Sequence, residues 1–266
     1  MAIEVFAPAK INLTLHVTGQ RADGYHLLDS LVVFADVGDR LTIDPAPRMR
    51  VDVSGPFSVG VPRDERNLVW RAAELAGVTT QISLEKNLPH GAGIGGGSSD
   101  AAAVLRALGA EAHALVLGSD VPVCLLDAPQ RMRGIGENVV PVGGVPALHL
   151  VLVNPGVHVP TPDVFKRLKK KENPPMDAHL QWSDRAAFLA WLIEQRNDLQ
   201  APAASGNPAI LAALKTLKGA ELARMSGSGS TCFGVYPDAE TVRDAAAEIA
   251  EKQPRWWVEA VTTVGA

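Results

Sequence analysis

The amino-acid sequence predicts an α+β fold built from two domains. The chain has 266 residues, enough for two hydrophobic cores of modest size. Short runs of alternating and β-branched residues predict strands in the first half, whereas helical periodicity dominates beyond residues 141–153. We therefore expect one domain over residues 1–147 and another over residues 148–266, whose last strand is a candidate to return to the first domain.

The first strand signal covers residues 10–17, where polar and apolar residues alternate strictly. This alternation places the polar side chains from Lys10 to His16 on one face and aliphatic side chains on the other. Further strands are predicted at residues 27–34, 40–43, 49–53 and 81–84, and a helix is predicted after its cap Asn67.

The second half combines helices with a few strands. Helices are predicted near residues 161–168, 183–195, 208–217 and 239–251, and strands near residues 148–153, 221–225, 231–236 and 256–262. Together they are similar to the ferredoxin-like layout, in which helices cover one face of an antiparallel sheet.

The most informative segment is a glycine-rich stretch that runs through two serines into an alanine-rich helix. We call residues 89–99 the phosphate loop. Glycine has no Cβ and tolerates positive φ, so successive backbone N–H groups can converge on one anion, and Ser98 or Ser99 is expected to cap the helix whose positive end faces it. The residues expected to hold phosphate are Pro89, Gly91, Ala92, Gly93, Ile94, Gly95, Gly96, Gly97, Ser98 and Ser99.

Two looser patterns also fit the phosphate loop. Its glycines match the dinucleotide fingerprint, but that motif needs a strand leading directly into the first glycine, and residues 87–89 intervene. The P-loop spacing also fits, but Gly97 and Ser98 replace its lysine and hydroxyl residue. A mobile linker would seldom open onto an alanine-rich helix. A phosphate-binding loop of another kind is therefore the preferred interpretation.

Composition narrows the class of protein. The net charge of −4 and the pI near 6.0 argue against a nucleic-acid-binding protein. The two cysteines, Cys124 and Cys232, lie among apolar residues and are predicted to be buried thiols in a reducing compartment. No metal-ligand spacing, signal peptide or long apolar run is present in the sequence, so we expect a cytoplasmic protein without a membrane contact.

A second glycine-rich turn covers residues 226–230, between two predicted strands. An ordinary hairpin would explain it. Its run of small residues, however, would also let the backbone closely approach a phosphate or the phosphate loop.

Three separated segments together resemble one family, the GHMP kinases. They are residues 8–12, residues 89–103 with the phosphate loop, and residues 227–229. The resemblance spans the chain and implies an N-terminal domain like domain 2 of ribosomal protein S5, followed by a ferredoxin-like α+β domain. Within the family, the chain is most similar to the members that phosphorylate the C2 hydroxyl of 4-diphosphocytidyl-2-C-methyl-D-erythritol in the non-mevalonate isoprenoid pathway. The matching segments are residues 8–13, 19–26, 95–99, 118–122, and 160–162 followed by Phe165.

The resemblance implies a kinase that uses ATP and Mg²⁺. By position in the family motif, Asp120 accepts the proton of the alcohol, and Lys10 holds that carboxylate ionised and offsets charge on the transferred group. Ser99 is the tentative Mg²⁺ contact, and Asn67 and Lys86 are expected near adenine. For Asp100 we favour a stabilising charge in the first helical turn over an indirect metal contact.

For the cytidine substrate, the resemblance implies an aromatic slot and nearby polar contacts. The expected residues are Asn12, Tyr25, His26, Thr161 and Phe165. The segment from Arg106 to Leu117 is shorter than is typical of the family, so the position of Asp120 depends on a short connection. Another alcohol kinase of the family and a catalytically silent nucleotide-binding regulator are the alternatives, and no protein partner is expected.

Overall fold

A computed structural model describes residues 1–265 of the chain, which form two compact units. Unit 1 comprises residues 1–10, 37–90 and 95–127, and unit 2 comprises residues 11–36, 91–94 and the chain from residue 128 onward. The domain boundary expected after residue 147 stays a prediction, because these units are made of interleaved segments rather than of two consecutive halves.

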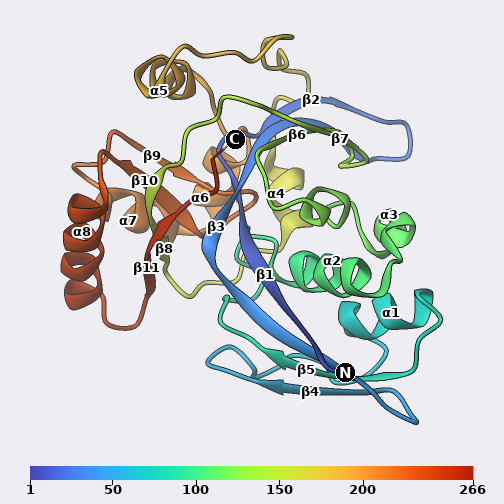
Figure 1. Cartoon of the computed structure of the whole chain (residues 1–266). Coiled ribbons are helices and arrows are strands. Elements are labelled where there is room, and N and C mark those ends of the chain that lie inside the picture. Colours follow the sequence, from blue (N-terminus) through green and yellow to red (C-terminus); the bar gives the residue numbers. More distant parts are fainter. Residues whose placement is uncertain (266) are drawn as a thin grey trace. The chain divides into compact units, whose positions relative to one another are not determined.

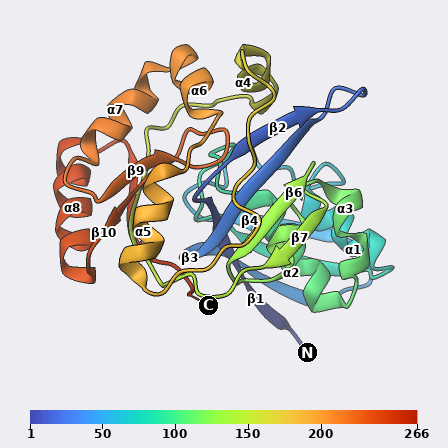
Figure 2. The same cartoon turned by 90° about the horizontal axis from the view of Figure 1, so that it is seen from above.

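Unit 1 combines strands with short helices. Its elements are β1 (Ile3–Asn12, as far as Lys10), the second part of β3 (His26–Pro45), β4 (Arg50–Ser54), α1 (Leu68–Leu75), β5 (Thr80–Glu85), α2 (Gly96–Leu108), η1 (Glu111–His113), α3 (Ala114–Leu117) and η2 (Pro122–Leu125). β5 pairs antiparallel with β3 and parallel with β4. Helices α1, α2 and α3 contact one another (Figure 2). Alanines 101–103 of α2 are fully buried, because their small side chains let neighbouring elements approach closely.

Unit 2 contains an antiparallel four-stranded sheet. It is formed by β8 (His149–Asn154), β9 (Leu222–Met225), β10 (Cys232–Tyr236) and β11 (Trp257–Thr262), in the order β11-β8-β10-β9. Helices α7 (Pro208–Thr216) and α8 (Ala239–Lys252) pack on one face of this sheet and share a hydrophobic core with it (Figure 1). The structure therefore confirms the ferredoxin-like arrangement expected for this part of the chain.

The rest of unit 2 surrounds the first part of β3. Strand β2 (His16–Gln20) pairs with β3, and so does β6 (Gln130–Gly134), which in turn pairs with β7 (Asn138–Pro141). The remaining helices are α4 (Thr161–Arg167), α5 (Arg185–Glu194) and α6 (Gln200–Gly206). After β11, Thr263 bridges to Ala35 of β3, so the chain end does reach a strand from the first part of the sequence.

Three local predictions were wrong. The strand expected over residues 10–17 is split, because β1 ends at Asn12 and both Leu13 and Thr14 donate their backbone N–H to the carbonyl of Leu31. The two runs expected at residues 27–34 and 40–43 are one strand of 20 residues, β3. Helix α6 was missed because Pro202 and a run of small residues weaken its helical signal.

Candidate active site

Lys10 and Asp120 form an ion pair in unit 1. The Lys10 ammonium donates to Oδ2 of Asp120 at 2.7 Å. The lysine side chain is 4% exposed, whereas that of Asp120 is 41% exposed. One face of the carboxylate therefore remains open to a second group, while the cation is held in place by the protein.

The segment that carries Asp120 is fixed to α2. Asp120 lies in the turn before η2, and η2 is held by Arg106 of α2. The Arg106 guanidinium donates to the carbonyls of Cys124 and Leu125 and pairs with Asp127 at 2.8 Å. The short connection noted in the sequence is filled by η1 and α3, so Asp120 is held by regular structure on both sides.

The phosphate loop ends in the N-terminus of α2. The helix begins at Gly96, with Gly95 in the left-handed conformation as its N-cap and no side-chain cap among the described residues. The expected cap by Ser98 or Ser99 was therefore wrong, because the helix starts earlier and both serines lie within its first turns. Its terminal N–H groups are left without a side-chain partner, which is the arrangement that suits an anion.

The two serines have different surroundings. Ser98 is partly exposed, whereas Ser99 is 1% exposed and its hydroxyl finds no hydrogen-bond partner among the described residues. Asp100, the fifth residue of α2, lies beyond the first turn, so its expected role as a first-turn charge was also wrong. Its carboxylate instead accepts from the ammonium of Lys86 at 2.7 Å.

Lys86, Asp39 and Asp100 form a buried cluster in unit 1. Lys86 donates to Oδ2 of both carboxylates, and all three residues are less than 4% exposed. Burial raises the pKa of Asp100 well above its usual range. Burial lowers the pKa of Lys86, but the two carboxylates outweigh it and leave that pKa above its ordinary value. The Lys86 ammonium thus uses two of its three N–H donors within this cluster.

Asn67, the other residue expected near adenine, is the N-cap of α1. Its side-chain oxygen accepts from the backbone N–H of Val69, and its side-chain amide donates to the carbonyl of Pro62. The predicted cap is therefore confirmed. An adenine contact by Asn67 or Lys86 stays a prediction.

The middle of the phosphate loop belongs to unit 2, where it meets the second glycine-rich turn. The Ser226 hydroxyl donates to the Gly93 carbonyl at 2.9 Å, and the backbone N–H of Thr231 donates to the Ala92 carbonyl at 3.0 Å. A Cβ at Gly93, whose φ is +74°, would collide with the carbonyl oxygen of Ser226. The turn joins β9 and β10 as a hairpin, and it also makes the predicted close approach to the phosphate loop.

The expected aromatic slot is only partly assembled in unit 2. The rings of His26 and Phe165 are stacked on each other, with centroids 4.5 Å apart and an angle of 20° between planes. No space for a base remains between these two rings. Tyr25 is 60% exposed, and Nε2 of His26 is buried without a hydrogen-bond partner in the described part of the chain.

Asn12 and Thr161 both contact the second glycine-rich turn within unit 2. The Asn12 backbone N–H donates to the Ser226 hydroxyl at 3.0 Å, and its side-chain amide donates to the Ser30 hydroxyl at 2.8 Å. Its Oδ1 is buried and accepts no hydrogen bond from any described residue. The hydroxyl of Thr161, at the start of α4, lies 2.7 Å from that of Ser228. Asn12 thus contacts both the second glycine-rich turn and β3.

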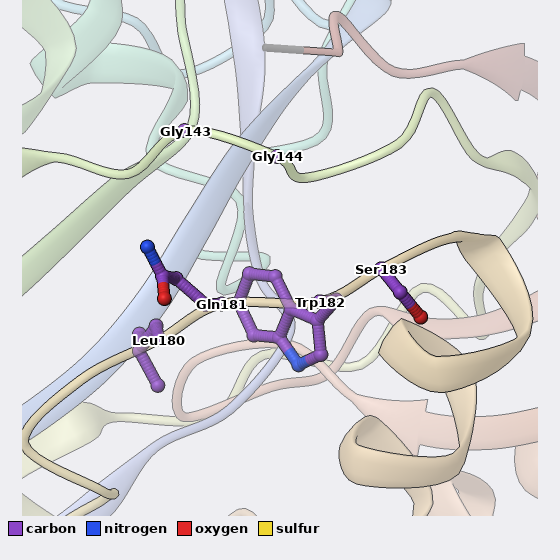
Figure 3. A pocket seen from close by; sticks show the side chains of 6 residues that line it. All are labelled: Gly143, Gly144, Leu180, Gln181, Trp182 and Ser183. Atoms are coloured by element: carbon purple, nitrogen blue, oxygen red, sulfur yellow. The ribbon is translucent and has the colours of Figure 1, made fainter.

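Several features lie away from these residues. One pocket in unit 2 includes none of the predicted site residues (Figure 3). It is lined by Gly143, Gly144 and residues 180–183.

Cys124 and Cys232 are buried free thiols, as expected, and burial raises the pKa of each to about 12. Over residues 1–265, no cluster of three or more potential metal-ligating side chains is present. No helix in that range is long and apolar enough to cross a membrane.

Three residues near these sites were missed from the sequence as functional. Asp39 is fully buried within β3, but its neighbours Asp36 and Arg40 are charged as well, so no local signal distinguishes it. The roles of Ser226 and Arg106 depend on contacts with distant residues, and no local pattern predicts such contacts.

Known proteins resemble the chain over its whole length. The family model described as GHMP kinases N terminal domain matches residues 67–126, and that described as GHMP kinases C terminal matches residues 179–255. A relative from Paracoccus denitrificans named 4-diphosphocytidyl-2-C-methyl-D-erythritol kinase is 54% identical over 96% of this chain and 94% of its own length. A relative of the same name from Ruegeria pomeroyi is 52% identical over 97% of this chain and 98% of its own length.

Solved structures show the same similarity. The crystal structure of a 4-(cytidine 5'-diphospho)-2C-methyl-D-erythritol kinase has a TM-score of 0.80 and 34% identity, covering 99% of this chain and 100% of its own. A homoserine kinase from Cytophaga hutchinsonii has a TM-score of 0.69 at 18% identity, covering 99% of this chain and 95% of its own, and so shares the fold.

Proposed function

Because the chain belongs to the GHMP kinase family, we propose that it is an ATP-dependent kinase acting on the C2 hydroxyl of 4-diphosphocytidyl-2-C-methyl-D-erythritol. The products are the 2-phosphate of that alcohol and ADP. The proposal rests on the Lys10–Asp120 pair, found in a chain 54% identical to a relative of this name. Its buried free thiols suit a cytoplasmic protein.

Unit 1 supplies the acid–base chemistry. An alcohol is a weak nucleophile at neutral pH, so a carboxylate that accepts its proton accelerates the attack on the γ-phosphorus. The exposed face of Asp120 is open to this hydroxyl. The ammonium of Lys10, 2.7 Å away, orients the carboxylate and offsets negative charge that grows on the transferred group. The C2 oxygen gains the phosphoryl group, ADP leaves, and the hydroxyl proton passes to Asp120.

The phosphate loop suits the triphosphate of ATP. Residues 91–95 include three glycines with positive φ, and the uncapped N-terminus of α2 offers backbone donors. Mg²⁺ would neutralise phosphate charge during transfer. Since no cluster of three acidic or other metal-ligating side chains occurs over residues 1–265, the ion would take most of its ligands from phosphate and water, with Ser99 or the more exposed Ser98 as a protein contact.

Unit 2 supplies groups that could recognise the cytidine part of the substrate. Nε2 of His26 and Oδ1 of Asn12 are buried polar atoms without a partner among residues 1–265, and a ligand would satisfy them. Because His26 and Phe165 already stack on each other, cytosine would stack on an outer face of this pair. Tyr25, one residue before His26, adds an exposed ring. Thr161 adds a hydroxyl beside Ser228.

The test is ADP release from Mg·ATP with and without the proposed alcohol. We expect turnover that depends on it, with mevalonate and homoserine far poorer. Turnover of another alcohol instead would support the assignment as a kinase but contradict the assignment of this substrate. ATP binding without turnover of any alcohol would favour a silent nucleotide-binding regulator.

A further inference from the structure

The Asp39–Lys86–Asp100 cluster connects the two ends of the phosphate loop within unit 1. Lys86 lies three residues before the loop, at the end of β5, and Asp100 directly follows it in α2. Oδ1 of Asp39 accepts hydrogen bonds from the backbone N–H groups of Asn87 and Leu88, at 2.6 and 2.9 Å. The cluster thus binds both the chain that enters the loop and the helix that leaves it.

The backbone around Lys86 is itself tightly fixed. Its N–H donates to the Ser54 carbonyl at 2.8 Å, and its carbonyl accepts from the N–H of Phe57 at 3.1 Å. Gly55 passes so close to Lys86 that a Cβ there would lie 2.6 Å from the Lys86 carbonyl oxygen. The cation is therefore a rigid anchor for the two carboxylates.

Stability alone is a poor explanation for this cluster. Removing three ionisable groups from water is costly, and well-packed apolar side chains usually stabilise a core equally well. Hydrogen bonds between charged groups, in contrast, fix geometry closely. Gly96, the first residue of α2, packs against the cluster: a Cβ there would lie 3.5 Å from Nζ of Lys86.

We propose that Asp39, Lys86 and Asp100 are positioning residues that hold the phosphate loop in the geometry that binds the phosphates of ATP. They act through the backbone on either side of the loop. The proposal rests on the use of ATP, and it is independent of which alcohol is phosphorylated.

The test compares Lys86→Met, Asp100→Leu and Asp100→Asn with the parent protein. Affinities for Mg·ATP, ADP and adenosine are measured by calorimetry in the absence of alcohol, so that a wrong substrate assignment would not affect the result. Asp100→Asn keeps an oxygen that can accept from Lys86, and it is the variant most certain to fold. Asp29→Leu is the matched control for Asp100→Leu, because it removes the buried Asp29–Arg131 ion pair in unit 2.

We expect Lys86→Met and Asp100→Leu to weaken Mg·ATP and ADP binding by about tenfold or more while adenosine binding stays within about twofold. Asp100→Asn should retain most of the affinity. Asp29→Leu should lower the melting temperature without changing ATP affinity.

Equal losses for ATP and adenosine would overturn the proposal, because they would place the cluster at the base. Folded variants with parental ATP affinity would overturn it as well, leaving a structural cluster only. If Lys86→Met and Asp100→Leu both fail to fold, the double variant Lys86→Met/Asp100→Asn, which removes opposite charges together, supplies the same comparison.

Discussion

The Lys10 ammonium and the Asp120 carboxylate meet at 2.7 Å although 110 positions separate them in the sequence. The pair is asymmetric, since the lysine is buried and the aspartate is 41% exposed. A purely structural ion pair at the surface contributes little to stability and would expose both side chains. A carboxylate that accepts a proton from substrate must be accessible, whereas its counter-charge must be held in place. The exposed Asp120 and the buried Lys10 meet these two requirements.

We expect Asp120→Asn to lower kcat by about a hundredfold or more, because the amide cannot accept the hydroxyl proton. Affinity for Mg·ATP should be nearly unchanged. Asp127→Asn is the control, since Asp127 is a nearby carboxylate paired with Arg106 rather than with Lys10. Parental ADP release by Asp120→Asn would remove Asp120 from the mechanism.

Lys10→Met should also reduce kcat by about a hundredfold, because an uncharged side chain neither orients Asp120 nor offsets the transferred charge. Lys10→Arg should rescue little, since a planar guanidinium does not fit the space of a buried ammonium. Gly95 limits that space: a Cβ there would lie 3.0 Å from Cβ of Lys10. Turnover numbers at saturating ATP give the comparison, and full activity of Lys10→Met would contradict the assignment.

The two serines of α2 predict different responses to Mg²⁺. If Ser99 contacts the metal, Ser99→Ala should raise the Mg²⁺ concentration for half-maximal activity by about tenfold, and Ser98→Ala should not. The measurement is a Mg²⁺ titration at fixed ATP. The reverse result would assign the contact to Ser98, which is the more exposed of the two.

Phe165→Ala should raise KM for the cytidine substrate by about tenfold, because the ring holds His26 and offers a stacking face for the base. KM for ATP should not change. Trp182→Leu, which removes an aromatic ring from the separate pocket in Figure 3, serves as the control. Equal effects of both substitutions on KM would argue against a cytosine slot at Phe165.

His16 predicts a dependence of stability on pH. Burial, followed by the nearby Arg196, lowers the pKa of His16 below its ordinary value of 6.5. Between the lowered pKa and 6.5 the unfolded chain binds a proton that the folded protein does not, so stability is lost as the pH falls through this window. The loss from this group at pH 5.5 is about 1.4 kcal/mol at most.

Urea unfolding at pH 7.5 and 5.5 tests this dependence. The free energy of unfolding should fall less on acidification in His16→Gln than in the parent protein. His113→Gln, at a partly exposed position, should behave like the parent. An identical fall in His16→Gln and the parent would mean that His16 does not titrate differently in the folded protein.

The sequence predicts the second half of the fold better than the first. Helices such as α8 and the strands β8–β11 have strong periodicity and clear ends, so their positions follow from local pattern. The break between β1 and β2 depends instead on the bonds of Leu13 and Thr14 to Leu31, which alternation cannot reveal. The continuity of β3 depends on its several partner strands.

In the candidate site, too, the sequence predicts the features that local conformation determines and misses those that depend on distant contacts. The phosphate loop is predictable because glycines must occur in it for local conformational reasons, and Gly91, Gly93 and Gly95 do have positive φ. The Lys10–Asp120 pair came from a family resemblance, since nothing local relates the two residues. The shifted pKa values of Lys86 and Asp100 could not be predicted from the sequence. Both depend on Asp39, which lies in a strand distant along the chain.

The interleaving of the two units has a consequence for synthesis of the chain on the ribosome. Unit 1 can be complete once Asp127 has emerged, but residues 11–36 belong to unit 2 and must then wait for the chain beyond residue 128. The edge strand β11 is among the last parts to arrive. Within residues 11–36, β2 can pair with the first part of β3 early, but β3 must wait for its other partner, β6, so one of its edges stays exposed in the nascent chain and is prone to aggregate. The arrival of the chain beyond residue 128 thus determines when this edge of β3 is protected from misassembly.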